Sequence, residues 1–176
     1  ATGLRHSGRL SHFLCGVVDE SDPSAFMPTL CVNGKSTSYE NLDKIMELTG
    51  FRAATAEEPL QMGKWFECDN HGTAVPDFIS YRSFQRNMQE DFNGWTHSKK
   101  TYPDLWIRPD DSIVLELKGQ EFVPTKEFSA GLTMRFPRIK YVRHDAIDGG
   151  TKSAYEVDTH QTLFQLYWET LRQRQE

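Results

Sequence analysis

Short apolar segments bounded by turn residues characterise the start of the chain. Residues 13–18 (FLCGVV) form an apolar run of strand length, and residues 26–32 form a second run that ends at Asn33-Gly34. Asn-Gly favours tight turns because both residues accept a left-handed backbone conformation. The pattern therefore predicts two strands and a turn, with a loop over residues 19–24 between the strands.

Two segments show a helical period instead. After the turn, Thr37 and Glu40 have the spacing of a capping box, Gly50 is placed to end a helix, and the apolar stripe between them consists of Leu42, Ile45, Met46 and Leu48. Residues 159–173 carry a second stripe, after Asp158 or Thr159 as N-cap, made of Leu163, Leu166, Tyr167 and Leu171. We expect each helix to bury its apolar stripe against the strands.

The second half of the chain predicts strands that are interrupted. Residues 105–107, 112–123 and 132–142 each carry apolar residues in a strand-like pattern. Gly119 lies inside the middle segment and predicts a bulge or a tight bend, as found at the corners of small barrels. Pro137 lies inside the last segment and predicts an edge strand or a bulge.

One domain accounts for these elements. Residues 1–11 are polar and are interpreted as a lead-in segment to a domain over residues 12–176. Residues 52–102 are rich in aromatic side chains but broken by Gly and Pro, which predicts an insertion packed on the domain, with a short helix near residues 80–91. The expected fold is mainly β: an OB-fold, a five-stranded Greek-key barrel, with two peripheral helices.

Composition limits the classes of function. The chain of 176 residues has 25 acidic and 20 basic side chains, a net charge of −5, which counts against coating nucleic acid by bulk charge. With 11 Phe, 6 Tyr and 4 Trp the chain has enough large side chains for a core, so full disorder is excluded. No apolar run is long enough to span a membrane and no signal-peptide pattern opens the chain, so we expect no membrane partner. Three widely spaced cysteines and no C-x-x-C predict a reduced intracellular protein without a zinc site.

A cluster of cations stands out against this acidic background. Arg135, Arg138, Lys140 and Arg143 occur within nine residues that contain no acid. Such a set binds phosphates, either of a nucleic-acid backbone or of a nucleotide. The alternative is a solvated strand face whose cations pair with acids from elsewhere in the fold.

These residues also carry a resemblance to a known family. RFPRIKYVRHD, over residues 135–145, resembles the last nucleotidyltransferase motif of ATP-dependent DNA ligases. Residues 103–125 resemble the strand pair that precedes this motif in the C-terminal OB-fold domain. Residues 7–18 and the closing helix are similar to the segments that begin and end that domain in ligases of the ligase IV type. The matches follow the order of the family.

The resemblance implies roles for particular residues. In that family the OB domain closes on the nucleotidyltransferase domain for adenylylation and then clamps nicked DNA in nuclear break repair. By resemblance, Arg143 is a catalytic residue that contacts the β and γ phosphates of ATP, with Arg138 as a further phosphate ligand. Lys118, Lys140 and Arg138 are the implied DNA contacts. Arg135 is interpreted as helping to hold its strand in place, at least in part. The implied partners are nicked or broken duplex DNA and the catalytic domain of the same protein, the implied state is a monomer, and ATP and Mg²⁺ belong to the full-length enzyme.

Two features limit the chemistry of this chain. The closing lysine of the family motif falls at Ala146, which leaves one expected pyrophosphate contact without a charge. The K-x-D-G nucleophile motif does not occur in the chain, so the chain does not ligate DNA alone. Two alternatives therefore stay open: a non-catalytic OB module that binds DNA or a repair partner, and a plain protein-interaction domain.

Overall fold

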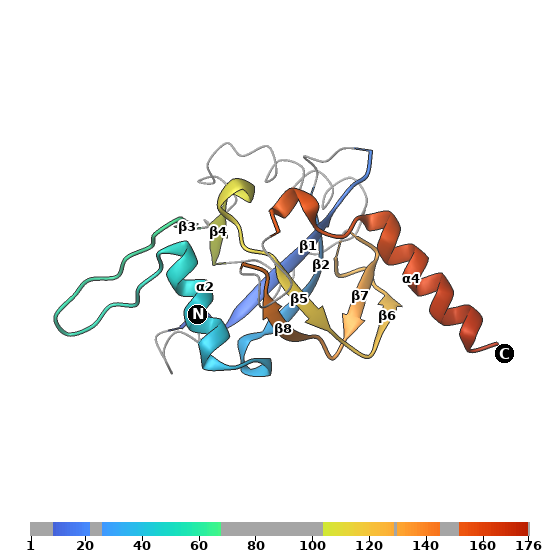
Figure 1. The fold of residues 1–176 in the computed structure, drawn as a ribbon, viewed down its shortest axis with the longest axis horizontal. Helices are drawn as coiled ribbons and strands as arrows, with labels where there is room; N and C mark the ends of the chain where they lie inside the picture. Colours follow the sequence, from blue (N-terminus) through green and yellow to red (C-terminus); the bar gives the residue numbers. More distant parts are fainter. Residues whose placement is uncertain (1–8, 22–25, 68–103, 129, 145–151, 176) are drawn as a thin grey trace.

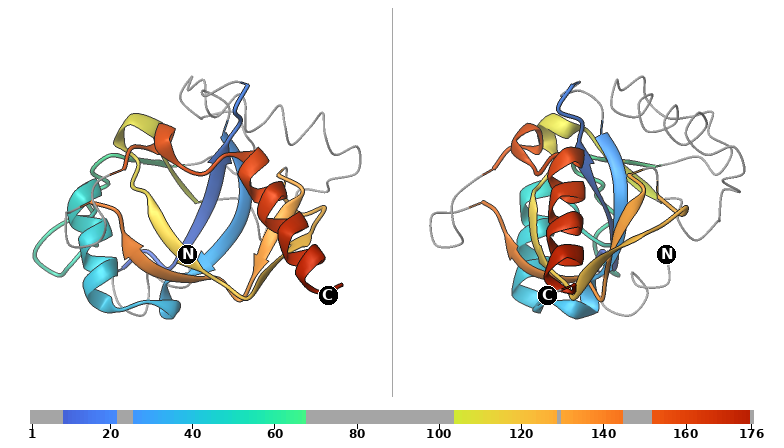
Figure 2. Two further views of the ribbon diagram at one scale, coloured as in Figure 1. Left: turned by 45° about the vertical axis from the view of Figure 1, so that its right-hand side comes forward. Right: turned by 90° about the vertical axis from the view of Figure 1, so that its right-hand side faces the viewer.

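A computed structural model of the chain describes residues 9–21, 26–67, 104–128, 130–144 and 152–175. Within these residues the chain forms eight short strands and two α-helices, with α2 and α4 at opposite ends of the strand region (Figures 1 and 2). The strands are β1 (His12–Val18), β2 (Phe26–Asn33), β3 (Trp65–Glu67), β4 (Leu105–Ile107), β5 (Leu115–Lys118), β6 (Glu121–Pro124), β7 (Leu132–Arg135) and β8 (Arg138–Val142). The helices are α2 (Tyr39–Thr49) and α4 (His160–Gln173), and three 3-10 turns cover Gly34–Ser36, Pro109–Asp111 and Ala154–Glu156.

The strands pair as four antiparallel couples: β1 with β2, β3 with β4, β5 with β8, and β6 with β7. Strand β2 also lies against β7 and β8, which brings the first hairpin next to the last two strands. The expected mainly β class with two helices is confirmed. Closure of these pairs into a five-stranded OB barrel stays a prediction.

The first strand pair contains a bulge that places a polar side chain in the core. Its register shifts at Gly16, so that Thr29 is the extra residue on β2. Thr29 is only 3% exposed, and its Oγ1 donates a hydrogen bond of 2.6 Å to the carbonyl of Leu132 on β7. This bond satisfies the buried hydroxyl and ties the first hairpin to the second half of the chain.

Helix α2 ends where the sequence predicts and begins one residue later than predicted. Gly50 adopts a left-handed conformation (φ 71°) and ends the helix. The N-cap is Ser38, whose side chain accepts the amide of Asn41, so the predicted cap at Thr37 is wrong by one residue. Thr37 instead accepts a bond from the Asn41 side chain. The apolar stripe of α2 faces the larger core.

Helix α4 begins after Thr159, one of the two predicted caps, which accepts the amide of Thr162. Leu163 is buried on this helix as expected. Leu166, expected on the buried face, is 41% exposed, because Phe164 takes the inward position instead.

The two long strands predicted in the second half are each divided. Gly119 separates β5 from β6, which confirms the predicted bend, and a Cβ atom at Gly119 would lie 2.2 Å from Cγ of Met134. Phe136, with a φ of 53°, and Pro137 separate β7 from β8. Each half then pairs separately.

The first part of the predicted insertion contains β3, which the sequence did not indicate, and the helix expected near residues 80–91 lies outside the described residues.

Two groups of buried side chains form the core. The larger joins β1, β2, α2 and β8, and it consists of Leu10, Phe13, Leu30, Val32, Leu42, Ile45, Phe51, Ile139 and Val142. The smaller lies under α4 and consists of Val17, Met27, Ala130, Leu132 and Leu163. Because Ile139 and Val142 point inward from β8, the intervening residues of that strand are directed outward.

Candidate functional site

The pair of β5 and β8 presents three of the predicted site residues on its outer side. Lys118 lies opposite Arg138 in the register, and both side chains are exposed. The register shifts between Glu116 and Leu117, so Lys140 is the extra residue of a bulge and is exposed as well. We call Lys118, Arg138 and Lys140 the cationic strand face. Neither Lys118 nor Arg138 forms an ion pair with another residue that the structure describes.

A single acid on the neighbouring strand contacts two cations of the motif. Glu116 Oε1 lies 3.6 Å from Lys140 Nζ, and its Oε2 lies 3.7 Å from Arg143 Nη1. The Glu116 side chain is 35% exposed, so these pairs are partly screened by water. The motif is free of acid in sequence, but strand pairing supplies one. The alternative of a salt-bridged strand face therefore describes Lys140 and Arg143, and it does not describe Lys118 and Arg138.

A second acid has a purely structural arrangement. Glu121 on β6 contacts Arg135 on β7 at 3.4 Å and also pairs with Arg174 at the end of α4. The Glu121 side chain is only 12% exposed. These pairs join β6, β7 and α4, which gives Arg135 a local role in holding the strands together.

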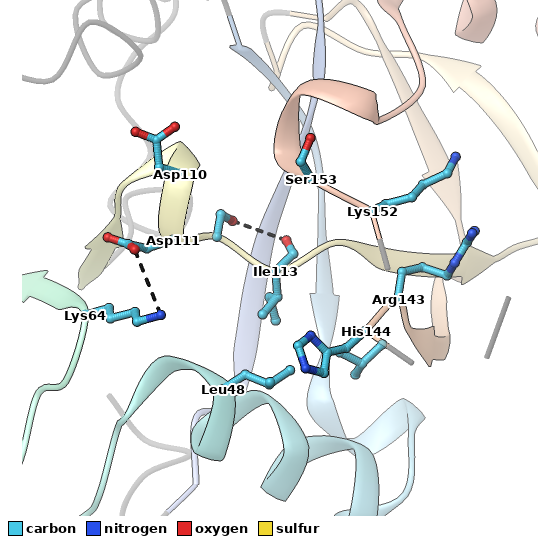
Figure 3. Close-up of a pocket in the computed structure, with 11 residues that line it drawn as sticks. Leu48, Lys64, Asp110, Asp111, Ile113, Arg143, His144, Lys152 and Ser153 are labelled. Atoms are coloured by element: carbon cyan, nitrogen blue, oxygen red, sulfur yellow. Dashed lines mark hydrogen bonds and ion pairs between the residues drawn. The ribbon is translucent and has the colours of Figure 1, made fainter. Parts of the chain in front are cut away.

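A cavity of about 270 Å³ opens where β8 ends, beside the 3-10 turn over Pro109–Asp111 (Figure 3). We call it the Arg143 pocket. Its lining includes Lys64, Asp110, Asp111, Arg143 and Lys152. Lys64 precedes β3, the two aspartates follow β4, Arg143 follows β8, and Lys152 precedes the 3-10 turn over Ala154–Glu156, so residues far apart in sequence converge at one place.

The main chain fixes Arg143 at the edge of this pocket. Its amide donates to the carbonyl of Val114 at 2.9 Å, and its own carbonyl accepts the amide of Lys152 at 3.3 Å. Figure 3 shows the side chains of Arg143 and Lys152 extending in the same direction, with Lys64 and Asp111 on the other side of the pocket. Arg143 and Lys152 thus place two neighbouring cations on one side of the pocket, with their charged ends directed away from Lys64 and Asp111, and Arg143 is also paired with Glu116.

The acids of the pocket are already engaged. Asp111 lies 3.9 Å from Lys64 Nζ, and Asp110 accepts a hydrogen bond of 2.9 Å from the hydroxyl of Tyr155. This hydrogen bond raises the pKa of Tyr155 above its usual value, because the neutral phenol is the donor. Because both aspartates have partners, they repel an anion near Arg143 less strongly than two free carboxylates would.

Arg138 and Arg143, both expected at ATP phosphates, do not lie together. They are separated by the length of β8, about 15 Å along an extended strand. Arg138 does not line the Arg143 pocket. The structure instead places Arg138 with Lys118 and Lys140 on the strand face, and Arg143 alone of these four at the pocket.

Three residues of this region were missed by sequence reasoning as members of a site. Glu116 reads as an ordinary strand acid, and Lys64 and Lys152 are isolated lysines in irregular segments. No local signal marks them, because strand pairing and loop packing alone bring them to the motif. Within the part of the chain that the structure describes, no three His, Cys, Asp or Glu side chains gather to hold a metal ion. The described helices include none that is long and apolar enough to cross a membrane.

Comparison with known proteins gives a consistent family of relatives. The chain is 27% identical over 161 residues to a DNA ligase 4 of Neurospora crassa, a match that covers 90% of the chain. It is 46% identical over 144 residues to DNA ligase 4 of Aspergillus fumigatus, over 80% of the chain. It is 27% identical over 142 residues to the human DNA ligase 4, over 78% of the chain.

These matches cover a small part of the relatives. The chain spans 13% of the Neurospora protein and 12% of each of the other two. No family model matches the chain. The similarity therefore concerns one segment of much longer proteins.

Proposed function

Because this chain is related over most of its length to a segment of DNA ligase 4, we propose that it is the OB-fold domain of a ligase IV-like, ATP-dependent DNA ligase. In this role it closes on the nucleotidyltransferase domain of the same protein for adenylylation. It then clamps nicked DNA during double-strand break repair by end joining in the nucleus. ATP and Mg²⁺ are used by the full-length enzyme rather than bound by this domain alone.

The observation that carries the proposal is the placement of two cation sets at different places on one strand pair. The cationic strand face lies on the outer side of β5 and β8, and Arg143 lies at the end of β8 at a pocket. A domain that meets nucleotide phosphates in one step and DNA phosphates in another needs two such surfaces.

The strand face suits DNA phosphates. Lys118 and Arg138 are opposite each other, exposed, and without an ion pair to another described residue. They therefore bring their charge to a backbone phosphate without first breaking an internal ion pair. Contacts of this kind fix position on a duplex and do not read its sequence.

Arg143 suits the leaving pyrophosphate. During adenylylation, negative charge grows on the β and γ phosphates as their bond to the α phosphate breaks. A guanidinium held at the pocket edge stabilises that charge as it develops. The ion pair with Glu116 at 3.7 Å, partly open to water, is exchanged for the phosphate contact.

Two measurements test this function. For DNA, Lys118→Gln and Arg138→Gln are each expected to weaken binding to a nicked duplex about three- to tenfold and to lower the salt slope, while Lys126→Gln, an exposed lysine between β6 and β7, changes neither. For adenylylation, Arg143→Gln in a protein that also carries the catalytic domain is expected to lower formation of the AMP–enzyme by about a hundredfold. Unchanged DNA binding together with unchanged adenylylation would contradict the proposal.

A second candidate is a non-catalytic OB module that binds DNA or a repair partner. Ala146, where the resemblance expects a lysine, favours it. If the catalytic domain, with its lysine nucleophile intact, forms no AMP–enzyme when joined to this chain, the binding module is the correct description.

A further inference from the structure

The cationic side of the Arg143 pocket contains a charge that the fold does not use. Lys152 is half-buried and lines the cavity, yet it forms no ion pair with any residue that the structure describes. The other lysine of the lining, Lys64, lies 3.9 Å from Asp111. Among the described residues, no carboxylate therefore competes with an anion for the ammonium group of Lys152.

The backbone holds Lys152 next to Arg143. The amide of Lys152 donates to the carbonyl of Arg143 at 3.3 Å, and the two side chains extend the same way (Figure 3). Ser153, the following residue, also lines the pocket and adds a hydroxyl. Two cations and a hydroxyl on one side match a ligand whose negative charges are adjacent.

Polyphosphate is such a ligand, and the pocket favours it over DNA. A cavity of about 270 Å³ has room for a chain of two or three phosphates and is too small for a duplex. Asp110 and Asp111 stand on the opposite wall and would face an approaching DNA backbone with like charge.

We propose that Lys152 is the second polyphosphate-binding cation of the pocket and acts together with Arg143. The inference rests on the proposed function, and it extends that function by naming the residue that supplies the charge lacking at Ala146. Lys152 follows Ala146 in the chain and is brought to Arg143 by the backbone contact described above. The ligand class is inorganic pyrophosphate or the β and γ phosphates of a nucleoside triphosphate.

Pyrophosphate titration of the isotope-labelled 176-residue chain, followed by amide chemical shifts, tests the proposal. Lys152→Gln is expected to weaken pyrophosphate binding about tenfold, the loss of one charge-assisted contact. Lys152→Arg is expected to restore the affinity to within about threefold, because charge rather than shape is required. Lys126→Gln, which removes an exposed lysine outside the pocket, serves as the matched control and leaves the affinity unchanged.

The outcomes separate the inference from the function on which it rests. If Lys152→Gln binds pyrophosphate as the parent chain does while Arg143→Gln does not, the inference is wrong and the nucleotide function stands. If the parent chain does not bind pyrophosphate, or if Arg143→Gln also binds it unchanged, the inference is wrong, and formation of the AMP–enzyme by Arg143→Gln joined to the catalytic domain decides the proposed function separately. If Lys152→Gln reduces affinity for a nicked duplex more than affinity for pyrophosphate, Lys152 is a DNA contact and the inference is overturned.

Discussion

Replacing Glu116 with glutamine tests whether this acid competes with phosphate for Lys140 and Arg143, as the proposed function requires. The change keeps the size of the side chain and removes the carboxylate that lies 3.6 Å from Lys140 and 3.7 Å from Arg143. We expect the variant to fold normally and to bind a nicked duplex more tightly than the parent chain.

The magnitude follows from the exposure of the pairs. At these distances the Coulomb energy of one pair is about 1 kcal/mol in water and about 4 kcal/mol at an effective dielectric constant of 20. The side chain of Lys140 is 49% exposed and that of Glu116 is 35% exposed, which places this pair near the weak end, while Arg143, at 19%, is less open to water. Measured exposed pairs contribute about 0.2–1 kcal/mol each, so the free energy of unfolding should fall by at most about 2 kcal/mol. Without the Glu116 carboxylate, an incoming phosphate is no longer repelled at this point, which should raise DNA affinity about two- to fivefold.

Fluorescence anisotropy with a labelled nicked duplex over a range of sodium chloride concentrations measures the effect. The slope of log affinity against log salt should become steeper by up to about one, since Lys140 gains a phosphate partner in place of Glu116. Glu127→Gln, an exposed acid between β6 and β7, is the matched control for the change of net charge. If Glu116→Gln raises affinity no more than Glu127→Gln does, local competition by Glu116 is refuted.

Three further predictions concern the framework of the site. Gly63→Ala should lower the free energy of unfolding by more than about 2 kcal/mol in urea titrations, because φ is 59° and the new Cβ would lie 2.2 Å from the carbonyl oxygen of Thr49; a loss below 1 kcal/mol would contradict this. Burial raises the pKa of Cys15 to about 12, so the folded state holds the thiol proton more tightly than the unfolded state does. The free energy of unfolding should therefore fall as the pH rises from about 8.5 toward 12. Urea titrations over this range should find a smaller decline in Cys15→Ala. Thr29→Val should cost about 1–2 kcal/mol by thermal unfolding, because it removes the buried 2.6 Å bond to Leu132 and leaves that carbonyl short of a partner; an unchanged melting temperature would count against the bond.

The sequence indicated local structure well where the signal lies within a few residues. Gly50 ends α2 because only a residue tolerant of φ 71° continues the chain there, and glycine is the residue that does so at little cost. The N-cap was misplaced by one residue because Thr37 and Ser38 are both capable caps, and the choice depends on which hydroxyl reaches the Asn41 amide. Such alternatives differ by tenths of a kcal/mol and are decided by the surrounding fold.

The candidate site was predictable only in its cations. Arg138, Lys140 and Arg143 are neighbours in sequence, and their excess of positive charge is visible without a fold. Glu116 joins them through the antiparallel register of β5 and β8, which depends on a non-local pairing. Lys152 joins them through one backbone hydrogen bond between irregular segments. Periodicity carries no information about contacts of this kind, so the acid and the extra lysine could not be inferred.

The shared acid has a consequence for the order of binding. Glu116 divides its charge between Lys140, which belongs to the cationic strand face, and Arg143, which belongs to the pocket. When a phosphate binds Arg143 and breaks its ion pair with Glu116, the carboxylate pairs with Lys140 alone. It then competes more strongly with a DNA phosphate for Lys140. Occupation of the pocket and of the strand face should therefore disfavour each other, by an amount no larger than an exposed ion pair, about 1 kcal/mol. Under the proposed function, coupling of this sign would favour release of pyrophosphate before DNA binds, and it would need only the one glutamate placed between two cations.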